Sequence, residues 1–172
     1  MKIIPNKPIL MATAAFTLVT IALVTESQTA PVANPAPAVS EKAILARLND
    51  IQIAAQALDA DKVFSSVMEN NDGVIAQNGK VFLTRSNALE FTRQSFEALQ
   101  SAGAHVEYHF DQQHVAFLSP TIALATGEGL TTVTMGDGRI LKTQFAQSVV
   151  MVLTNGEWKV FHAHRSFVAP PS

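Results

Sequence analysis

Cysteine is absent from the 172-residue sequence. That absence excludes disulfides, a thiolate nucleophile, cysteine-ligated zinc and a lipid-modified amino-terminal cysteine. Charge is also scarce, since charged residues make up 15% of the chain and the formal net charge is −2. The sequence has no excess of positive charge and no run of like charges that could bind the phosphate backbone, so we expect no nucleic-acid partner. It has no glycine-rich phosphate loop either.

The amino-terminal residues have the layout of a targeting segment. Lys2 and Lys7 precede an uncharged apolar run, ILMATAAFTLVTIALV (residues 9–24), and an Ala/Pro-rich stretch follows. This layout predicts a secretory signal peptide and therefore an exported protein, periplasmic or secreted. The alternative is an uncleaved membrane anchor, in which case this segment is the chain's only membrane contact. We assign residues 1–30 to the signal or anchor and residues 31–40 to a linker.

The rest of the chain changes from a helical to a strand-like period. In its first half, apolar residues recur at three- and four-residue spacing in three segments, with a short hairpin around Asn78 and Gly79 before the third. In its second half the period becomes two, in four consecutive stretches separated by turn sequences. Helices followed by strands predict an α+β domain over residues 41–168, with residues 169–172 as a tail.

This order of elements, with its last strand, resembles the nuclear transport factor 2-like superfamily, and its SnoaL-like branch in particular. The sharpest stretch is NGEWKVFHAHRS (residues 155–166), which is similar to the turn and last strand of the association domain of calcium/calmodulin-dependent protein kinase II. The resemblance implies a cone, in which a curved antiparallel sheet packs on three amino-terminal helices around a pocket. It also implies that Arg165 lines this pocket and that the chain forms a homodimer through the outer face of the sheet.

The two histidines of the last strand raise the question of a metal site. Strand alternation puts His162 and His164 on one face and Phe161 and Arg165 on the other. A metal would need more ligands, and the last strand supplies no acidic residue after its first position. We therefore predict no metal and no other cofactor. Because the resemblance places Arg165 inside the cone, it implies that both histidines lie on the outer face with Trp158 and Val160.

Arg165 requires an anionic partner if it lies inside the cone, because a guanidinium keeps its charge. A two-residue turn in the GDG sequence (residues 136–138) places Glu128 opposite Gln147. A three-residue turn in TNG (residues 154–156) then puts both on the inner face with Arg165. Two interpretations stay open: an internal ion pair between Arg165 and Glu128, or a ligand anion held by Arg165.

The implied fold hosts both binding proteins and enzymes. We favour an exported SnoaL-like domain whose cone binds a small, mostly apolar molecule, which can carry an anionic group, with no catalysis assigned. One alternative is a cofactor-independent acid/base enzyme of isomerase, cyclase or dehydratase type, acting on a carbonyl compound with Glu128 as base beside Tyr108. The other is a dimeric interaction module. Catalytic residues are not predicted, and the candidate ligand-binding residues are Arg165, Glu128, Gln147, Phe161 and Tyr108.

Overall fold

The computed structural model describes residues 40–69, 73–77 and 79–168. The predicted signal or anchor and the predicted tail lie outside the described residues, as does the linker except for Ser40. Within the described part of the chain, no helix is both long and apolar enough to cross a membrane.

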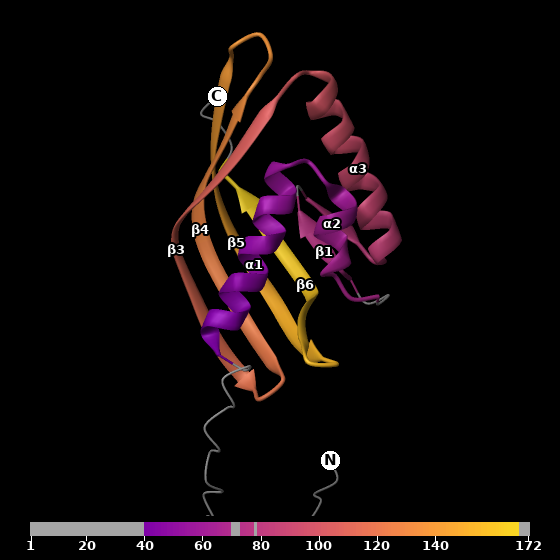
Figure 1. The fold of residues 1–172 in the computed structure, drawn as a ribbon, viewed down its shortest axis with the longest axis vertical. Helices are drawn as coiled ribbons and strands as arrows, with labels where there is room; N and C mark the ends of the chain where they lie inside the picture. The colour runs from indigo at the N-terminus through magenta and orange to yellow at the C-terminus, as the bar shows by residue number, and fades with distance from the viewer. Residues whose placement is uncertain (1–39, 70–72, 78, 169–172) are drawn as a thin grey trace, which may run out of the picture. The chain divides into compact units, whose positions relative to one another are not determined.

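The three predicted helices are present (Figure 1). Each begins after a polar residue whose side chain accepts a backbone hydrogen bond from the first turn, namely Ser40, Asp59 and Thr84. The third ends before Gly103, whose φ of 61° lies in the left-handed region that favours glycine. The helices are α1 (Glu41–Gln56), α2 (Ala60–Ser65) and α3 (Arg85–Ser101).

A six-stranded sheet, in the order β2-β1-β6-β5-β4-β3, carries the helices on one side (Figure 1). The four long strands form the antiparallel meander that the sequence predicts, and the short hairpin extends it because β1 pairs parallel to β6. The predicted fold class, an α+β domain with a curved sheet packed on three helices, is confirmed. The strands are β1 (Ile75–Gln77), β2 (Lys80–Phe82), β3 (His105–Ser119), β4 (Ile122–Thr134), β5 (Ile140–Thr154) and β6 (Glu157–Phe167).

The hydrophobic core lies between the first two helices and the inner face of the sheet. Ile44 of α1, Phe64 of α2 and Met151 of β5 are almost fully buried within it. Burying a side chain of this size stabilises the fold by about 1.5–3 kcal/mol. α3 contributes little, because Ala88 is the one buried residue among its 17. The space between α3 and the sheet is therefore not filled by packed side chains of that helix.

Both predicted turn lengths are wrong by one residue. The β4–β5 turn spans three residues, 136–138, since Met135 N donates to Arg139 O at 2.8 Å. The β5–β6 turn spans two residues, Asn155 and Gly156, with φ of 52° and 79°. Positive φ at both positions is the conformation of the two-residue hairpin turn that matches the strand twist.

β6 contains a bulge at Phe161, which the sequence analysis did not predict. Val160 pairs with Met151, but the preceding residue of β5 already pairs with His162, so Phe161 is the extra residue. Strand alternation is therefore interrupted. Trp158 and Val160 face the core and are 4% and 5% exposed, so the prediction that both lie on the outer face is wrong.

Candidate functional site

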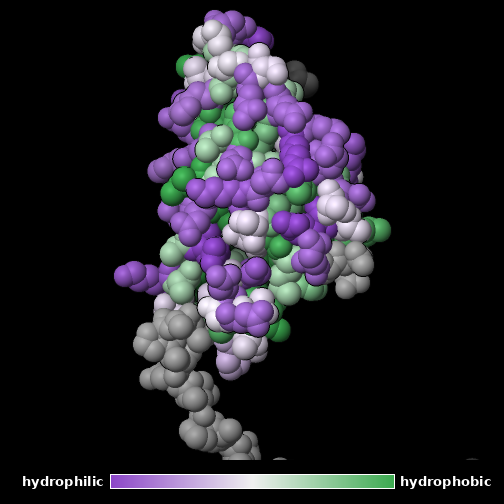
Figure 2. Space-filling view, turned by 45° about the vertical axis from the view of Figure 1, so that its right-hand side comes forward, coloured by the Kyte–Doolittle hydropathy of each residue, from purple (hydrophilic) through white to green (hydrophobic). Residues whose placement is uncertain are grey.

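A cavity of about 380 Å³ lies between the sheet and the helices. Its volume falls within the range of about 300–1,000 Å³ that is typical of small-molecule sites. Its walls are α1 and α2, the facing side of α3, and strands β1, β3, β5 and β6. Apolar side chains such as Phe64, Val149 and Val160 form much of the lining. From the α3 side, the molecular surface is mostly hydrophilic, with hydrophobic residues visible in the gaps between polar ones (Figure 2).

Arg165 of β6 lines this cavity. Its Nη2 donates to Gln147 Oε1 at 2.6 Å. Its guanidinium carbon lies 5.2 Å from the ring centroid of Tyr108 and 5.0 Å from that of Phe145, within the range of cation–π contacts. Burial lowers the pKa of Arg165, and the neighbouring Tyr108 phenol opposes that shift. An amide and two rings therefore surround the charge without neutralising it.

No carboxylate of the described residues forms an ion pair with Arg165 within 4.0 Å. The cavity lining likewise includes no Asp or Glu in that part of the chain. A guanidinium keeps its proton in proteins, so the positive charge is present whenever the cavity is empty. The cavity thus pairs an apolar interior with one uncompensated cation.

Glu128 does not line the cavity, and its predicted place opposite Gln147 is wrong. Because the β4–β5 turn has three residues, Gly127 takes that position. The exposed Glu128 carboxylate instead accepts a hydrogen bond from Gln112 Nε2 at 2.7 Å, with both residues paired across β3 and β4. The ion pair with Arg165 and the role of Glu128 as a base in the cavity therefore have no geometric support.

Phe161 is also absent from the cavity lining, because the bulge turns its neighbour Val160 inward instead. Three other predicted positions, Arg165, Gln147 and Tyr108, do line the cavity. Tyr108 is held by α1: its backbone carbonyl accepts from Gln52 Nε2 at 2.9 Å. Whether these residues contact a ligand stays a prediction.

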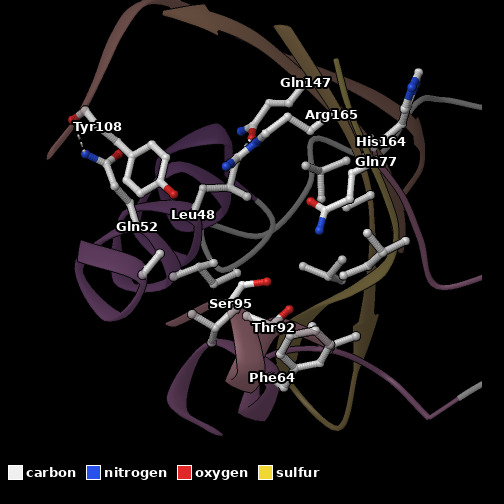
Figure 3. A pocket seen from close by; sticks show the side chains of 18 of the residues that line it. Leu48, Gln52, Phe64, Gln77, Thr92, Ser95, Tyr108, Gln147, His164 and Arg165 are labelled. Atoms are coloured by element: carbon white, nitrogen blue, oxygen red, sulfur yellow. Dashed lines mark hydrogen bonds between the residues drawn. The ribbon is translucent and has the colours of Figure 1, made fainter. Parts of the chain in front are cut away.

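The sequence analysis missed the polar residues on the other walls. Thr92 and Ser95 of α3 and Gln77 of β1 line the cavity and face its interior (Figure 3). The available signal was a pair of hydroxyl residues three apart within the apolar face of α3, between Phe91 and Leu99. Such residues on the apolar face of a helix mark positions that do not pack into a dry core.

The two histidines of β6 have separate surroundings. His162 Nδ1 lies 2.7 Å from the Gly73 carbonyl oxygen, and because a carbonyl only accepts, this nitrogen carries the proton. The imidazole of His164 is turned away from the cavity interior (Figure 3). In the described ranges, no three His, Asp or Glu side chains gather as metal ligands would.

Comparison with solved structures places the fold among known proteins. A nuclear transport factor 2-like superfamily protein from Salmonella enterica has 16% identity and a TM-score of 0.65, with 76% of this chain and 92% of that chain covered. A protein from Xanthomonas campestris, provisionally assigned as a calcium/calmodulin-dependent protein kinase II association domain, has 20% identity and a TM-score of 0.61, covering 78% and 93%. A ketosteroid isomerase-like protein from Erwinia carotovora atroseptica has 15% identity and a TM-score of 0.57, covering 75% and 96%. At these identities the likeness shows the fold alone.

The family is shown by a different comparison. No curated protein matches the chain. The model of the SnoaL-like domain, however, matches residues 44–170, which include α2, α3, all six strands of the described structure and all of α1 except its first three residues. The chain belongs to the SnoaL-like family and has the nuclear transport factor 2-like fold.

Proposed function

We propose that the cavity binds a small, mostly apolar organic anion, with Arg165 holding the anionic group. One observation carries the proposal: within the described residues, a guanidinium lines an apolar cavity that no carboxylate shares. A ligand carboxylate would supply the missing charge through charge-assisted hydrogen bonds, which are roughly twice as strong as neutral ones.

The neighbours of Arg165 support a carboxylate in particular. Gln147 Oε1 already accepts from Arg165, which leaves the Gln147 amide nitrogen as a second donor on the same wall. A planar carboxylate could accept from the guanidinium with one oxygen and from this amide with the other. The rings of Tyr108 and Phe145 hold the guanidinium in place, so little side-chain freedom is lost on binding.

Acid/base catalysis is not part of the proposal. Proton abstraction next to a carbonyl requires a positioned base, and Glu128 lies on the outer face of the sheet. The polar side chains that do line the cavity are amides, hydroxyls, Arg165 and the outward-turned His164.

The test uses phenylpropanoate as probe and phenylpropanamide as its neutral counterpart, with binding to the full chain measured by isothermal titration calorimetry. We expect the acid to bind about 10- to 100-fold more tightly than the amide, the range expected for hydrogen bonds to a charged group. Arg165→Met should remove this preference. Arg139→Met is the matched control, because Arg139 is exposed and pairs with Asp137 in the β4–β5 turn. Equal binding of acid and amide to the unaltered chain would refute the proposal.

We also propose that a second copy of the chain covers the outer face of the sheet, the homodimer that the family resemblance implies. Alternation with the buried Ala123 and Ala125 places Leu124 on the outer face, where it pairs with Val150. Light scattering after size-exclusion chromatography should give a dimer mass, and Leu124→Lys should give a monomer. Val81→Lys, at a 62% exposed position on β2, should leave the dimer intact. A monomeric unaltered chain would refute this proposal.

For residues 1–30, which lie outside the described structure, we propose export. Cell fractionation with mass spectrometry should find a chain that lacks the apolar run in the exported soluble fraction. An intact chain in the membrane fraction would establish the anchor instead.

A further inference from the structure

The two cavity-lining hydroxyl groups of α3, on Thr92 and Ser95, already use their protons in hydrogen bonds within the helix. Thr92 Oγ1 donates to the Ala88 carbonyl at 2.9 Å, and Ser95 Oγ donates to the Phe91 carbonyl at 2.9 Å. A hydroxyl has one proton, so each of these bonds uses the only donor of its side chain. The two hydroxyl oxygens can still offer their lone pairs to a ligand in the cavity. The α3 wall therefore presents acceptors.

The part of the sheet wall formed by Arg165 and Gln147 has the opposite character. Arg165 has donors alone, and Gln147 has committed its oxygen to Arg165, so its amide nitrogen faces outward from that bond as a donor. Arg165 and Gln147 lie across the cavity from Thr92 and Ser95 (Figure 3). A ligand that bonds to both pairs of residues would therefore carry acceptors at one end and a donor at the other.

We infer that the ligand is a hydroxylated organic acid, whose carboxylate lies at Arg165 and whose hydroxyl donates to Ser95 or Thr92. This inference rests on the proposed function and specifies its ligand class. An amino acid would also carry a donor, but an ammonium group would lack a counter-charge, because no acidic residue lines the described part of the cavity. A neutral hydroxyl donates without adding charge. The apolar lining fits the carbon skeleton between the two groups.

The test compares probes that differ only in the donor. The ortho, meta and para isomers of hydroxyphenylpropanoate are titrated against the full chain beside the matching methoxyphenylpropanoates, which keep the oxygen but lose the proton. We expect one hydroxy isomer to bind about fivefold more tightly than both its methoxy partner and phenylpropanoate, as expected for one net hydrogen bond. The isomer that binds most tightly indicates the separation of the two walls, because the ring position of its hydroxyl sets the distance from the carboxylate.

Variants of α3 test whether its hydroxyls cause the preference for the hydroxy isomer over its methoxy partner. The double variant Thr92→Val/Ser95→Ala should lose the fivefold preference, measured as the ratio of the affinities of the hydroxy isomer and of phenylpropanoate for the same variant. Thr92→Ser keeps a hydroxyl at the same position and should retain the preference. Thermal unfolding of each variant checks that the fold is kept.

The outcomes separate the two proposals. If no acid binds, or if Arg165→Met leaves the affinity for the acids unchanged, the proposed function and this inference are both refuted. If the acids bind through Arg165 but no hydroxy isomer binds more tightly than its methoxy partner, only the inference is refuted. It also falls if the preference persists in the double variant.

Discussion

Replacing Arg165 by methionine should stabilise the ligand-free protein. The substitution removes the hydrogen bond to Gln147, about 1.5–3 kcal/mol for a bond to a charged group. It also removes two cation–π contacts, to Tyr108 and Phe145, of about 0.5–1 kcal/mol each. Against these losses stands the desolvation of a cation without an anionic partner in the described chain, which amounts to several kcal/mol.

The net effect should be a rise in the free energy of unfolding of about 1 kcal/mol. Replacing a buried ion pair by well-packed apolar residues is often neutral or stabilises a protein by roughly 1–4 kcal/mol, and a cation without an anionic partner has less attraction to lose. We expect the lower end because Arg165 keeps partial solvent access through the cavity. For a domain of this size the midpoint of thermal unfolding should rise by roughly 4 °C.

Urea unfolding of the full chain without ligand, analysed by linear extrapolation, measures this change. The matched control is Arg85→Met, the same substitution at a satisfied arginine. Arg85 donates twice to the Phe64 carbonyl, at 3.0 and 2.9 Å, and pairs with Glu69 at 2.7 Å, so its loss should lower the free energy of unfolding by about 1–3 kcal/mol. If Arg165→Met lowered it by a similar amount, Arg165 would be a structural residue already satisfied by its neighbours, and the reasoning would be refuted.

Three further predictions concern the fold, and urea unfolding measures each. Gly129→Ala should cost about 3 kcal/mol, because a Cβ there would lie 2.0 Å from the His109 carbonyl oxygen; a cost below about 1 kcal/mol would mean that β3 yields. Met151→Ala should cost about 2–5 kcal/mol, since this side chain is fully buried, and a smaller loss would indicate collapse of the core onto the cavity. Arg93→Met should leave the urea midpoint close to that of the unaltered chain, because its ion pair with Asp61 is exposed; a clear fall in the midpoint would mean that α3 depends on this pair.

The helices and their limits could be predicted from the sequence because they depend on local chemistry. Ser40 and Thr84 cap helices through bonds to residues three positions later, and Gly103 stops α3 by its own backbone conformation. The four-stranded meander follows from period-two patterns between turn sequences in the same way. The parallel pairing of β1 with β6 could not be predicted, because it joins segments almost 90 residues apart, such as Ile75 and Ala163.

The faces of the long strands were harder to predict because they depend on counts of single residues. One extra residue in the β4–β5 turn moved Glu128 to the outer face. Between β5 and β6 two departures occurred: the turn is one residue shorter than predicted, and the bulge adds one residue. Together they shift the pairing of Gln147 by two positions, from Ala163 to Arg165. Two is an even number, so Gln147 and Arg165 still share the cavity face.

The bulge is also what lets one strand serve both the core and the cavity. Val160 and Arg165 are five positions apart, an odd separation, so in a regular strand they would point to opposite faces. Because Phe161 is an extra residue, both side chains point inward: Val160 packs in the core, and the guanidinium of Arg165 lines the cavity. A β6 without this residue could bury the apolar side chain or present the cation, but not both. The bulge therefore directs toward the cavity a cation that no carboxylate of the described residues pairs with, which is consistent with the tendency of bulges to change the direction of a side chain.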